Sequence, residues 1–187
     1  MPGIRVIAGE AKGRKLKMVP GEGTRPVGDR VKESLFNILG PDVVDAVFLD
    51  LFAGTGSVGI EALSRGAARA VFVDDHRAAV RTITANLETT RLQDRAVVKQ
   101  RDAFAYLRAE PPEAFDIVYL APPQYQGLWS KALVALDERT EWLSPDALVV
   151  VQIDPKEESS VELTRLVPDD RRRYGNTMLL FFRLPGV

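Results

Sequence analysis

A glycine-rich loop between residues 50 and 59, with the sequence DLFAGTGSVG, could bind a nucleoside cofactor. Gly54, Gly56 and Gly59 follow the G-x-G-x-x-G pattern, which lets a backbone turn tightly and approach a ligand closely. A helix that begins after these glycines would also offer unpaired amide groups to the ligand. The pattern alone is weak, because a glycine turn can equally serve the packing of a strand against a helix.

An acidic residue, Asp74, stands twenty residues after Gly54 and ends the next apolar run. At that spacing a carboxylate can accept hydrogen bonds from both hydroxyls of a ribose. The combination of loop and acid favours a nucleoside-bearing cofactor over a purely structural glycine turn.

Two further acids indicate which cofactor the loop would take. Asp50 lies four residues before Gly54, inside the first predicted strand. It would repel a diphosphate but attract the cationic amino acid end of S-adenosylmethionine, directly or through water. Asp102 follows the third predicted strand, where it could accept a hydrogen bond from the exocyclic amine of adenine. Each acid could instead cap a helix, but together with Asp74 they favour a cofactor with a sulfonium and no phosphate.

Length and composition exclude several other classes of function. The chain has 187 residues, too few for the separate nucleotide and substrate domains of a dehydrogenase, so a nicotinamide-dependent oxidoreductase is a weak alternative. It has no cysteine, which excludes disulfides, thiolate nucleophiles and the usual zinc knuckles, and we expect no metal. Apolar runs are at most five residues long, which predicts neither a membrane helix nor a secretory signal. We therefore expect a cytoplasmic protein without a membrane partner.

The net charge of the chain is only −1, but cations gather near its start. Residues 1–32 contain eight basic side chains and three acidic ones. The basic stretch KGRKLK at residues 12–17 lies between an apolar run and a turn-rich segment, which predicts a hairpin that presents cations. Such a surface could bind a polyanion, although a solvated face is as consistent with the charge alone.

Apolar periodicity predicts the α/β elements that must position these residues. Apolar strands are expected at residues 47–52, 70–74, 96–100, 117–120 and 147–153. Helices are expected from a cap at Asp29 to a stop at Gly40-Pro41, around Ile83 and Leu87, and over residues 128–136. This alternation predicts a doubly wound, mostly parallel sheet, with a basic extension over residues 1–28 and one domain over residues 29–187.

The end of the chain and the single histidine complete these expectations. An antiparallel strand at residues 177–183 is predicted to follow a turn at Gly175-Asn176. The arginine run at residues 171–173 is interpreted as a solvated turn, because Asp169 and Asp170 balance its charge. His76 is expected to begin a helix beside the cofactor, not to act in catalysis.

Six segments carry a family resemblance that spans nearly the whole chain: RVIAGEAKGRKL at residues 5–16, TRPVGDRVKESLFNIL at 24–39, DLFAGTGSVGIEALSRGA at 50–67, VFVDD at 71–75, RDAFAYL at 101–107 and RRYGNT at 172–177. They resemble the RsmD-type 16S rRNA (guanine-N2) methyltransferase family. The basic opening and the TRPVGDRVKESLFN stretch are specific to that family, whereas many methyltransferases share the glycine loop.

The resemblance implies a Rossmann-like class I S-adenosylmethionine-dependent methyltransferase fold with a seven-stranded, mostly parallel sheet, an antiparallel last strand and a basic N-terminal β-hairpin. It implies methyl transfer from S-adenosylmethionine, with S-adenosylhomocysteine as product, to the exocyclic amine of a guanine. The implied partner is 16S rRNA or the assembling small ribosomal subunit, and we expect a monomer.

The resemblance and the residue types together give three groups of candidate site residues. Cofactor binding is expected at Asp50, Phe52, Ala53, Gly54, Gly56, Asp74, Asp75, Asp102 and Ala103. The catalytic base pocket is expected at Pro122, Pro123, Gln124 and Tyr125. Phosphate contacts with RNA are expected at Arg5, Lys12, Arg14, Lys15, Arg25 and Arg30.

One motif departs from the family pattern. After the fourth strand the relatives carry Asp-Pro-Pro followed by Tyr or Phe, whereas this chain has Ala121-Pro122-Pro123-Gln124-Tyr125. A guanine amine is a poor nucleophile, and a carboxylate and a proline carbonyl that accept its hydrogens aim its lone pair at the methyl group. The methyl group of Ala121 accepts nothing, and loss of such an acceptor typically costs about 10² to 10⁴ in rate.

Two hypotheses about this departure stay open. In the first, the chain is an active or weakly active RNA methyltransferase that uses the Pro122 carbonyl and the Gln124 amide, while Tyr125 stacks on a flipped base. In the second, it binds cofactor and RNA with little or no transfer, or acts on a different nucleophile.

Overall fold

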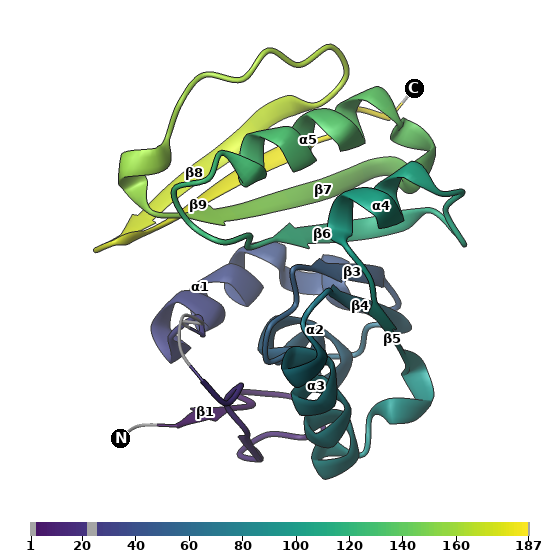
Figure 1. Ribbon diagram of the computed structural model, residues 1–187, viewed down its shortest axis with the longest axis vertical. Coiled ribbons are helices and arrows are strands. Elements are labelled where there is room, and N and C mark those ends of the chain that lie inside the picture. The colour runs from purple at the N-terminus through teal and green to yellow at the C-terminus, as the bar shows by residue number, and fades with distance from the viewer. Residues whose placement is uncertain (1–2, 22–25, 187) are drawn as a thin grey trace. The chain divides into compact units, whose positions relative to one another are not determined.

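The computed structural model describes residues 3–21 and 26–186, and the chain divides into two compact units, Met1–Ala103 and Phe104–Val187 (Figure 1). Within the described residues, seven strands belong to a mostly parallel sheet and two short strands form a separate hairpin. The predicted α/β class with an N-terminal hairpin is confirmed. No helix in the described ranges is both long enough and apolar enough to cross a membrane.

The first unit begins with a hairpin and continues with alternating helices and strands. Its elements are β1 (Ile4–Arg5), β2 (Lys15–Leu16), α1 (Asp29–Leu39), the 3-10 turn Gly40–Val43, β3 (Val47–Leu51), α2 (Ser57–Ser64), β4 (Arg69–Asp74), α3 (Arg77–Thr90), the 3-10 turn Gln93–Arg95 and β5 (Ala96–Gln100). The predicted strands at residues 47–52, 70–74 and 96–100 therefore match β3, β4 and β5.

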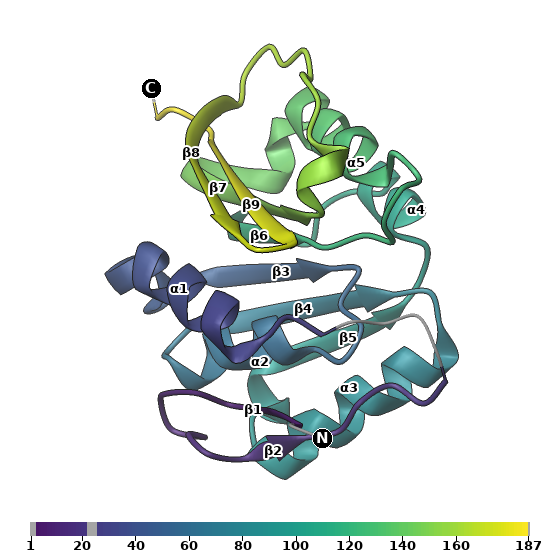
Figure 2. The ribbon, with the colours of Figure 1, turned by 90° about the vertical axis from the view of Figure 1, so that its left-hand side faces the viewer.

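Strands β3, β4 and β5 are parallel and lie side by side in the order β5-β4-β3 (Figure 2). Their registers pair Leu51 with Val73 and Asp74 with Gln100, so the three strands end at one edge. Helices α2 and α3 pack on these strands. Loops that carry ligand-binding residues commonly follow this edge of a parallel sheet.

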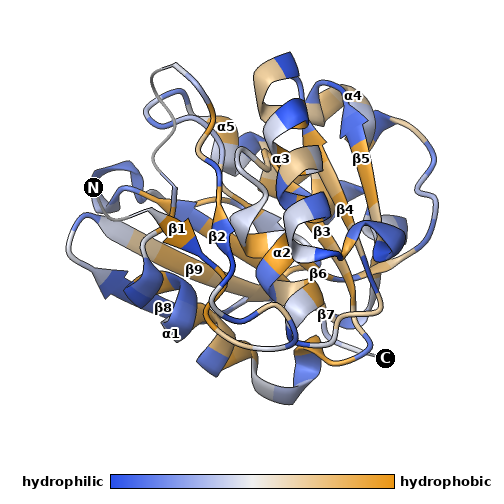
Figure 3. Cartoon of the chain, turned by 90° about the horizontal axis from the view of Figure 1, so that it is seen from below, coloured by the Kyte–Doolittle hydropathy of each residue, from blue (hydrophilic) through white to orange (hydrophobic). Residues whose placement is uncertain are grey.

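Apolar side chains of these elements form the core of the first unit. Phe48 and Leu49 of β3, Phe72 of β4, Ile60 of α2 and Ile83 of α3 have no exposed surface. Helix α3 alternates hydrophobic and hydrophilic segments along its length, as expected for a helix with one face on a sheet (Figure 3).

Helix α1 has the predicted bounds, but the predicted cap is wrong. Gly28 precedes the helix with an extended backbone and Asp29 is the first helical residue, without a side-chain cap. Its carboxylate instead lies 3.0 Å from Nε of Arg5 in the hairpin. A negative charge in the first turn still favours the helix through its dipole, and a tertiary partner has replaced the local capping contact.

The second unit contains the remaining strands. Its elements are α4 (Ala103–Arg108, starting at the unit boundary), β6 (Phe115–Leu120), α5 (Leu128–Glu138), the 3-10 turn Thr140–Trp142, β7 (Leu143–Ile153), the 3-10 turn Pro155–Glu157, β8 (Val167–Tyr174) and β9 (Thr177–Arg183). The strand order is β6-β7-β9-β8. Strands β6 and β7 are parallel, whereas β9 is antiparallel to both β7 and β8, which confirms the predicted antiparallel last strand.

The interpretation of residues 171–173 as a turn is wrong, because they lie within strand β8. This strand is at the end of the strand order and most of its side chains are exposed. Charged side chains are common on such edge strands, where they discourage pairing with other chains. The turn lies at Gly175 and Asn176, as predicted.

Candidate functional site

The glycine loop of the first unit, residues 52–56, joins β3 to α2 and has the bare backbone that its sequence predicts. Gly54 and Gly56 both have positive φ, 58° and 79°. Gly59 serves packing instead, because a Cβ atom there would lie 2.4 Å from the ring of Phe72. Helix α2 can therefore lie close against β4, while Ala53 and Gly54 stay partly accessible to a ligand.

Asp74, at the end of β4, is tied directly into the glycine loop. Its Oδ2 accepts a hydrogen bond from the Gly54 backbone N–H at 2.9 Å, and its Oδ1 accepts one from the His76 N–H at 3.0 Å. The side chain is 12% exposed. The carboxylate retains lone pairs for further donors, so Asp74 stands where a ribose at the loop would need an acceptor.

Asp75 and His76 follow β4, at the edge of the sheet where this strand ends. His76 immediately precedes helix α3, as predicted, and its ring Nδ1 lies 2.7 Å from the carboxylate of the exposed Asp75. Asp74, Asp75 and His76 bring potential metal ligand atoms within 4.8 Å of one another. The two oxygens of Asp74 accept hydrogen bonds from the backbone N–H groups of Gly54 and His76, so this cluster supports the glycine loop and the start of α3.

Asp50 is buried inside β3, where its environment differs from the one that the sequence analysis assumed. Its side chain is 1% exposed, and Oδ2 accepts a hydrogen bond from the Gly59 N–H at 3.0 Å. Burial raises the pKa of Asp50 to about 8, and the nearby charge of Asp74 adds to the shift while the Gly59 contact opposes it. With this pKa, Asp50 is mostly protonated at neutral pH, and it supports α2 through the Gly59 N–H.

Asp102 and Ala103 follow β5 at the same edge. Asp102 is exposed, and Ala103 is buried at the start of α4. The Arg101 N–H donates to the Asp74 carbonyl at 3.0 Å, which links the ends of β4 and β5. The acids that the sequence places at three successive strands are thus brought to one edge of the first unit, with Asp50 buried and Asp74 and Asp102 accessible.

The hairpin residues 4–17, here called the N-terminal arm, include four of the six residues predicted to contact RNA. Lys12, Arg14 and Lys15 are exposed on the arm, and Arg30 is exposed on α1. Arg5 is also exposed and is paired with Asp29. Arg25 lies outside the described residues.

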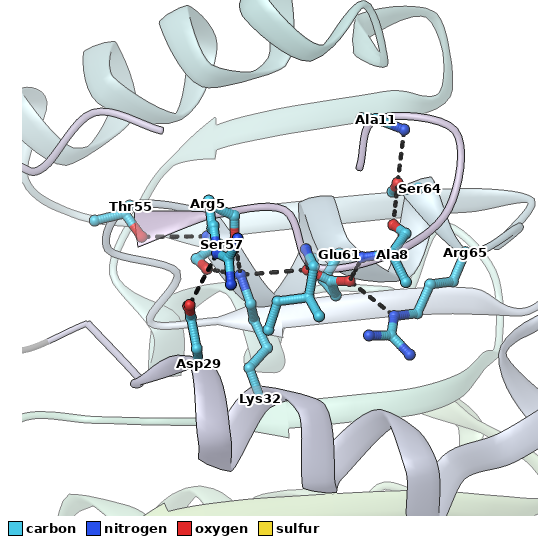
Figure 4. A network of polar contacts seen from close by, with 12 residues as sticks. Arg5, Ala8, Ala11, Asp29, Lys32, Thr55, Ser57, Glu61, Ser64 and Arg65 are labelled. Carbon is cyan, nitrogen blue, oxygen red and sulfur yellow. Dashed lines mark hydrogen bonds and ion pairs between the residues drawn. The ribbon is translucent and has the colours of Figure 1, made fainter. Parts of the chain in front are cut away.

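A buried carboxylate on α2, Glu61, fastens the arm to the helix that starts at the glycine loop. Its two oxygens accept hydrogen bonds from the N–H groups of Ile7 and Ala8 at 2.9 and 3.0 Å (Figure 4). Ser64, one turn later, accepts from the Ala11 N–H at 2.9 Å and donates to the Ala8 carbonyl at 2.7 Å. Gly9 permits this approach, since a Cβ atom there would overlap the carbonyl oxygen of Ser64.

Glu61 is also the centre of a buried ion cluster. Nζ of Lys32 lies 3.3 Å from one oxygen and Nε of Arg65 lies 2.8 Å from the other, with Glu61 fully buried and Lys32 1% exposed. Lys32 also donates to the Arg5 carbonyl and to Oγ of Ser57 (Figure 4). Burial lowers the pKa of Lys32, although the Glu61 carboxylate opposes this shift. Lys32 of α1 therefore holds the arm in place through the Arg5 carbonyl, and it does not add to the exposed positive charge of the arm.

Asn86 of α3 joins the arm to the glycine loop itself. Its side-chain oxygen accepts from the Lys17 N–H at 2.7 Å, and its amide nitrogen donates to the carbonyls of Lys17 and Thr55 at 3.1 and 3.0 Å. The sequence analysis gave no role to Asn86. The available signal was an amide in a helix interior, where asparagine is unfavourable unless it makes specific hydrogen bonds.

In the second unit, the residues after β6 form what we call the base loop, residues 121–126. Pro122 is buried, whereas Pro123, Gln124 and Tyr125 are exposed. The Tyr125 side chain is bound at its tip, since its hydroxyl donates to Oδ2 of Asp154 at 2.6 Å. Its backbone N–H donates to Oε1 of Glu157 at 2.7 Å. The sequence analysis named the loop residues but missed Asp154 and Glu157, which lie about thirty residues further along the chain.

Comparison with known proteins places the chain in a family. The model of the family described as Conserved hypothetical protein 95 matches residues 4–183. The chain belongs to this family.

Relatives of the chain are named as RNA methyltransferases. "Putative rRNA methyltransferase YlbH" of Bacillus subtilis is 40% identical over 185 residues, which cover 98% of this chain and all of that protein. "Ribosomal RNA small subunit methyltransferase D" of Escherichia coli is 40% identical over 149 residues, 80% of this chain and 74% of that protein. The solved structure titled "Putative methyltransferase yhhF from Escherichia coli" has 33% identity and a TM-score of 0.86, with coverage of 98% and 99%. The methyltransferase fold predicted from the sequence is confirmed.

Proposed function

We propose that this chain is an S-adenosylmethionine-dependent RNA methyltransferase that methylates the exocyclic amine, N2, of a guanine in 16S rRNA. The observation that carries the proposal is the tie between Asp74 and the glycine loop, at the edge where β3, β4 and β5 end. Family relatives that are named as rRNA methyltransferases support the same reaction class. The substrate is 16S rRNA or the assembling small subunit, and the protein acts as a cytoplasmic monomer.

The cofactor is S-adenosylmethionine, and the residues of the first unit fit it. Gly54 and Gly56 let it lie against the backbone beside Phe52 and Ala53, and Asp74 accepts from its ribose hydroxyls, with Asp75 adjacent. Asp102, next to Ala103, accepts from the adenine amine. Asp50, buried under the loop, ionises more readily when the cationic end of the cofactor approaches, because a nearby positive charge favours the carboxylate.

The cofactor supplies an electrophilic methyl group on a sulfonium. The guanine N2 lone pair attacks this carbon, the carbon–sulfur bond breaks with its electron pair left on sulfur, and N2 then loses a proton. The chain must therefore hold the amine, accept its hydrogens and orient its lone pair. The Pro122 carbonyl and the Gln124 amide oxygen are the acceptors in this motif, Pro123 shapes the pocket, and Tyr125 presents its ring for stacking.

RNA binds through the N-terminal arm, as the charge of its exposed residues suggests. Residues 1–28 act as an RNA-contacting extension of the methyltransferase domain, residues 29–187. Lys12, Arg14 and Lys15 contact phosphates, together with Arg5, Arg25 and Arg30. Because each phosphate contact releases counterions, Lys15→Ala should lower the slope of log affinity against log salt by about one. Binding titrations at several salt concentrations measure this slope.

The second hypothesis, a homologue with impaired transfer, follows from a specific residue. Ala121 stands where the family pattern has an aspartate, and its methyl group cannot accept a hydrogen from the amine. Of the residues in the motif, Gln124 and Pro122 offer neutral acceptors only. Under this hypothesis the same cofactor and RNA contacts form, but the chemical step is slow.

A transfer assay separates these hypotheses. Tritiated S-adenosylmethionine is incubated with undermethylated 30S particles, and the RNA is digested to nucleosides. We expect label in N2-methylguanosine for the wild type, an increase for Ala121→Asp, and loss for Asp74→Ala. Label in another nucleoside would contradict the N2 assignment, and label only with Ala121→Asp would support the impaired homologue.

A calorimetric titration with S-adenosylhomocysteine and with NAD tests the cofactor, and heat only with NAD would reject the proposal.

A further inference from the structure

Tyr125 adopts a backbone conformation that needs outside support. Its φ is 62°, in the left-handed region that a residue with a large side chain seldom occupies. The residue is 62% exposed, so packing does little to fix the ring. Whatever holds this residue must therefore act through its polar groups.

Two carboxylates supply that support from the turn after β7. Asp154 Oδ2 accepts from the Tyr125 hydroxyl at 2.6 Å, and Glu157 Oε1 accepts from the Tyr125 N–H at 2.7 Å. The tyrosine is thus held at both ends, by its backbone and by the tip of its ring. The hydroxyl contact raises the pKa of Tyr125 and lowers that of Asp154, as expected for a phenol that donates to a carboxylate.

The turn that carries the carboxylates is itself braced. The second oxygen of Asp154 accepts from the Lys156 N–H at 2.9 Å, and the second oxygen of Glu157 accepts from the Asp154 N–H at 3.1 Å. These reciprocal contacts form a capping box on the 3-10 turn Pro155–Glu157. Each carboxylate therefore has one oxygen on Tyr125 and one on a rigid turn, and β6 and β7 are neighbouring parallel strands that lead to the two loops.

We propose that Asp154 and Glu157 are positioning residues for methyl transfer, which fix the exposed Tyr125 ring as a preformed stacking surface for the target base. This inference rests on the proposed function, in which Tyr125 stacks on that base. A ring held in advance costs less entropy when the base arrives, and a small misplacement of a stacked substrate slows transfer strongly. The contacts are exposed and so contribute mainly to orientation, not to stability.

Single variants test the positioning role, because they should slow methyl transfer to RNA without changing the affinity for the cofactor product. Asp154→Ala and Tyr125→Phe each remove the hydroxyl contact, and we expect each to lower kcat/KM for 30S particles by about tenfold with the affinity for S-adenosylhomocysteine unchanged. Asp154→Asn keeps an acceptor and should retain most of the activity. Glu157→Gln keeps one of two acceptors and should lose less than Asp154→Ala. Tyr125→Ala, which also removes the ring, should lose the most.

A double variant and a charge control make the test specific. Tyr125→Phe combined with Asp154→Ala should be no worse than Asp154→Ala alone, because both substitutions remove the same hydroxyl contact. Glu158→Gln removes a negative charge from the residue after the turn without touching Tyr125, and it should leave transfer unchanged. Wild-type rates in Asp154→Ala, or additive losses in the double variant, would overturn the inference.

A spectroscopic readout separates failure of this inference from failure of the proposed function. In protein labelled with 3-fluorotyrosine, the Tyr125 resonance is the one missing from Tyr125→Phe, and we expect Asp154→Ala to move it in the free protein. Absence of transfer by the wild type would reject the proposed function and this role with it. Transfer by the wild type with an unmoved resonance in Asp154→Ala would reject only the positioning role.

Discussion

The glycine loop and the base loop each contain a non-glycine residue in a left-handed conformation, Phe52 and Tyr125, yet they are supported in different ways. The glycine loop is held by the buried or nearly buried side chains of Asp74 and Asn86, and buried Asp50 holds the helix that follows it through the Gly59 N–H. The base loop is held by carboxylates at the surface of the second unit.

This difference has an energetic consequence. A buried polar group that loses its partner retains the full cost of its desolvation, whereas an exposed group exchanges its partner for water. Breaking contacts near the glycine loop should therefore lower the free energy of unfolding. Breaking contacts at the base loop should change function with little effect on stability.

The largest effect is expected for Glu61→Gln in the buried ion cluster. The amide leaves the charges of Lys32 and Arg65 uncompensated and directs a donor at backbone N–H groups of the arm. We expect a loss of about 3 to 5 kcal/mol in the free energy of unfolding, measured by urea denaturation. Glu162→Gln, at an exposed site, is the control and should unfold like the wild type. If Glu61→Gln and Glu162→Gln had equal urea midpoints, the buried ion cluster would not add to stability, and the contrast between the two regions would lose this support.

A smaller effect is expected for Asp50→Asn, as a change in pH dependence. Because the pKa of Asp50 is about 8 in the folded protein and 3.8 as its ordinary value, the folded state binds more protons than the unfolded state between these values. The contribution of protonated Asp50 to the free energy of unfolding is therefore full below pH 4. It is lost as pH rises toward 8, at about 1.4 kcal/mol per pH unit.

The asparagine variant keeps an acceptor for Gly59 but does not titrate. Between pH 5 and pH 7 its stability should fall by about 2 to 3 kcal/mol less than that of the wild type. Denaturation curves at the two pH values measure the difference. Parallel pH profiles for wild type and variant would mean that Asp50 is ionised in the folded protein.

Asn86→Ala should lower the free energy of unfolding by about 1 to 3 kcal/mol, because it leaves the buried carbonyl of Thr55 and the part-buried backbone groups of Lys17 without their partner. Affinity for S-adenosylhomocysteine should fall as well, since Thr55 belongs to the glycine loop. Denaturation and calorimetric titration measure the two effects. Asn37→Ala, on the exposed face of α1, is the matched control, and an equal result for both variants would remove the role given to Asn86.

The smallest effect on stability is expected at the base loop. Asp154→Ala should unfold at the same temperature as the wild type in a thermal melt, although its transfer rate falls. A clear drop in melting temperature would mean that the contact with Tyr125 supports the second unit itself. The contrast between the two loops would then be wrong.

Local signals in the sequence predicted much of the fold. The bounds of α1 and β5 follow from apolar periodicity and from the Gly40-Pro41 stop. The glycine pattern predicted a tight turn, in which Gly54 and Gly56 have positive φ. The predicted turn at residues 171–173 failed because charge was taken as a sign of a loop, whereas an edge strand tolerates the same charges.

The candidate site was predictable where spacing along the chain carries the information. Asp74 could be assigned from its separation of twenty residues from Gly54 along the sequence, because consecutive parallel strands bring their ends to one edge. The partners of Glu61 and Tyr125 could not be assigned in this way, since those contacts join segments about thirty to fifty residues apart.

The amino-acid sequence by itself determined the order of helices and strands, the bare loop and the acids at or near the ends of three strands, because these depend on local periodicity and spacing. Only the tertiary structure decided that Asp50 is buried and mostly neutral, that Lys32 holds the arm from inside, and that Asp154 holds Tyr125. Those properties depend on which elements pack together, since packing sets both the desolvation of a charge and the partner that compensates it.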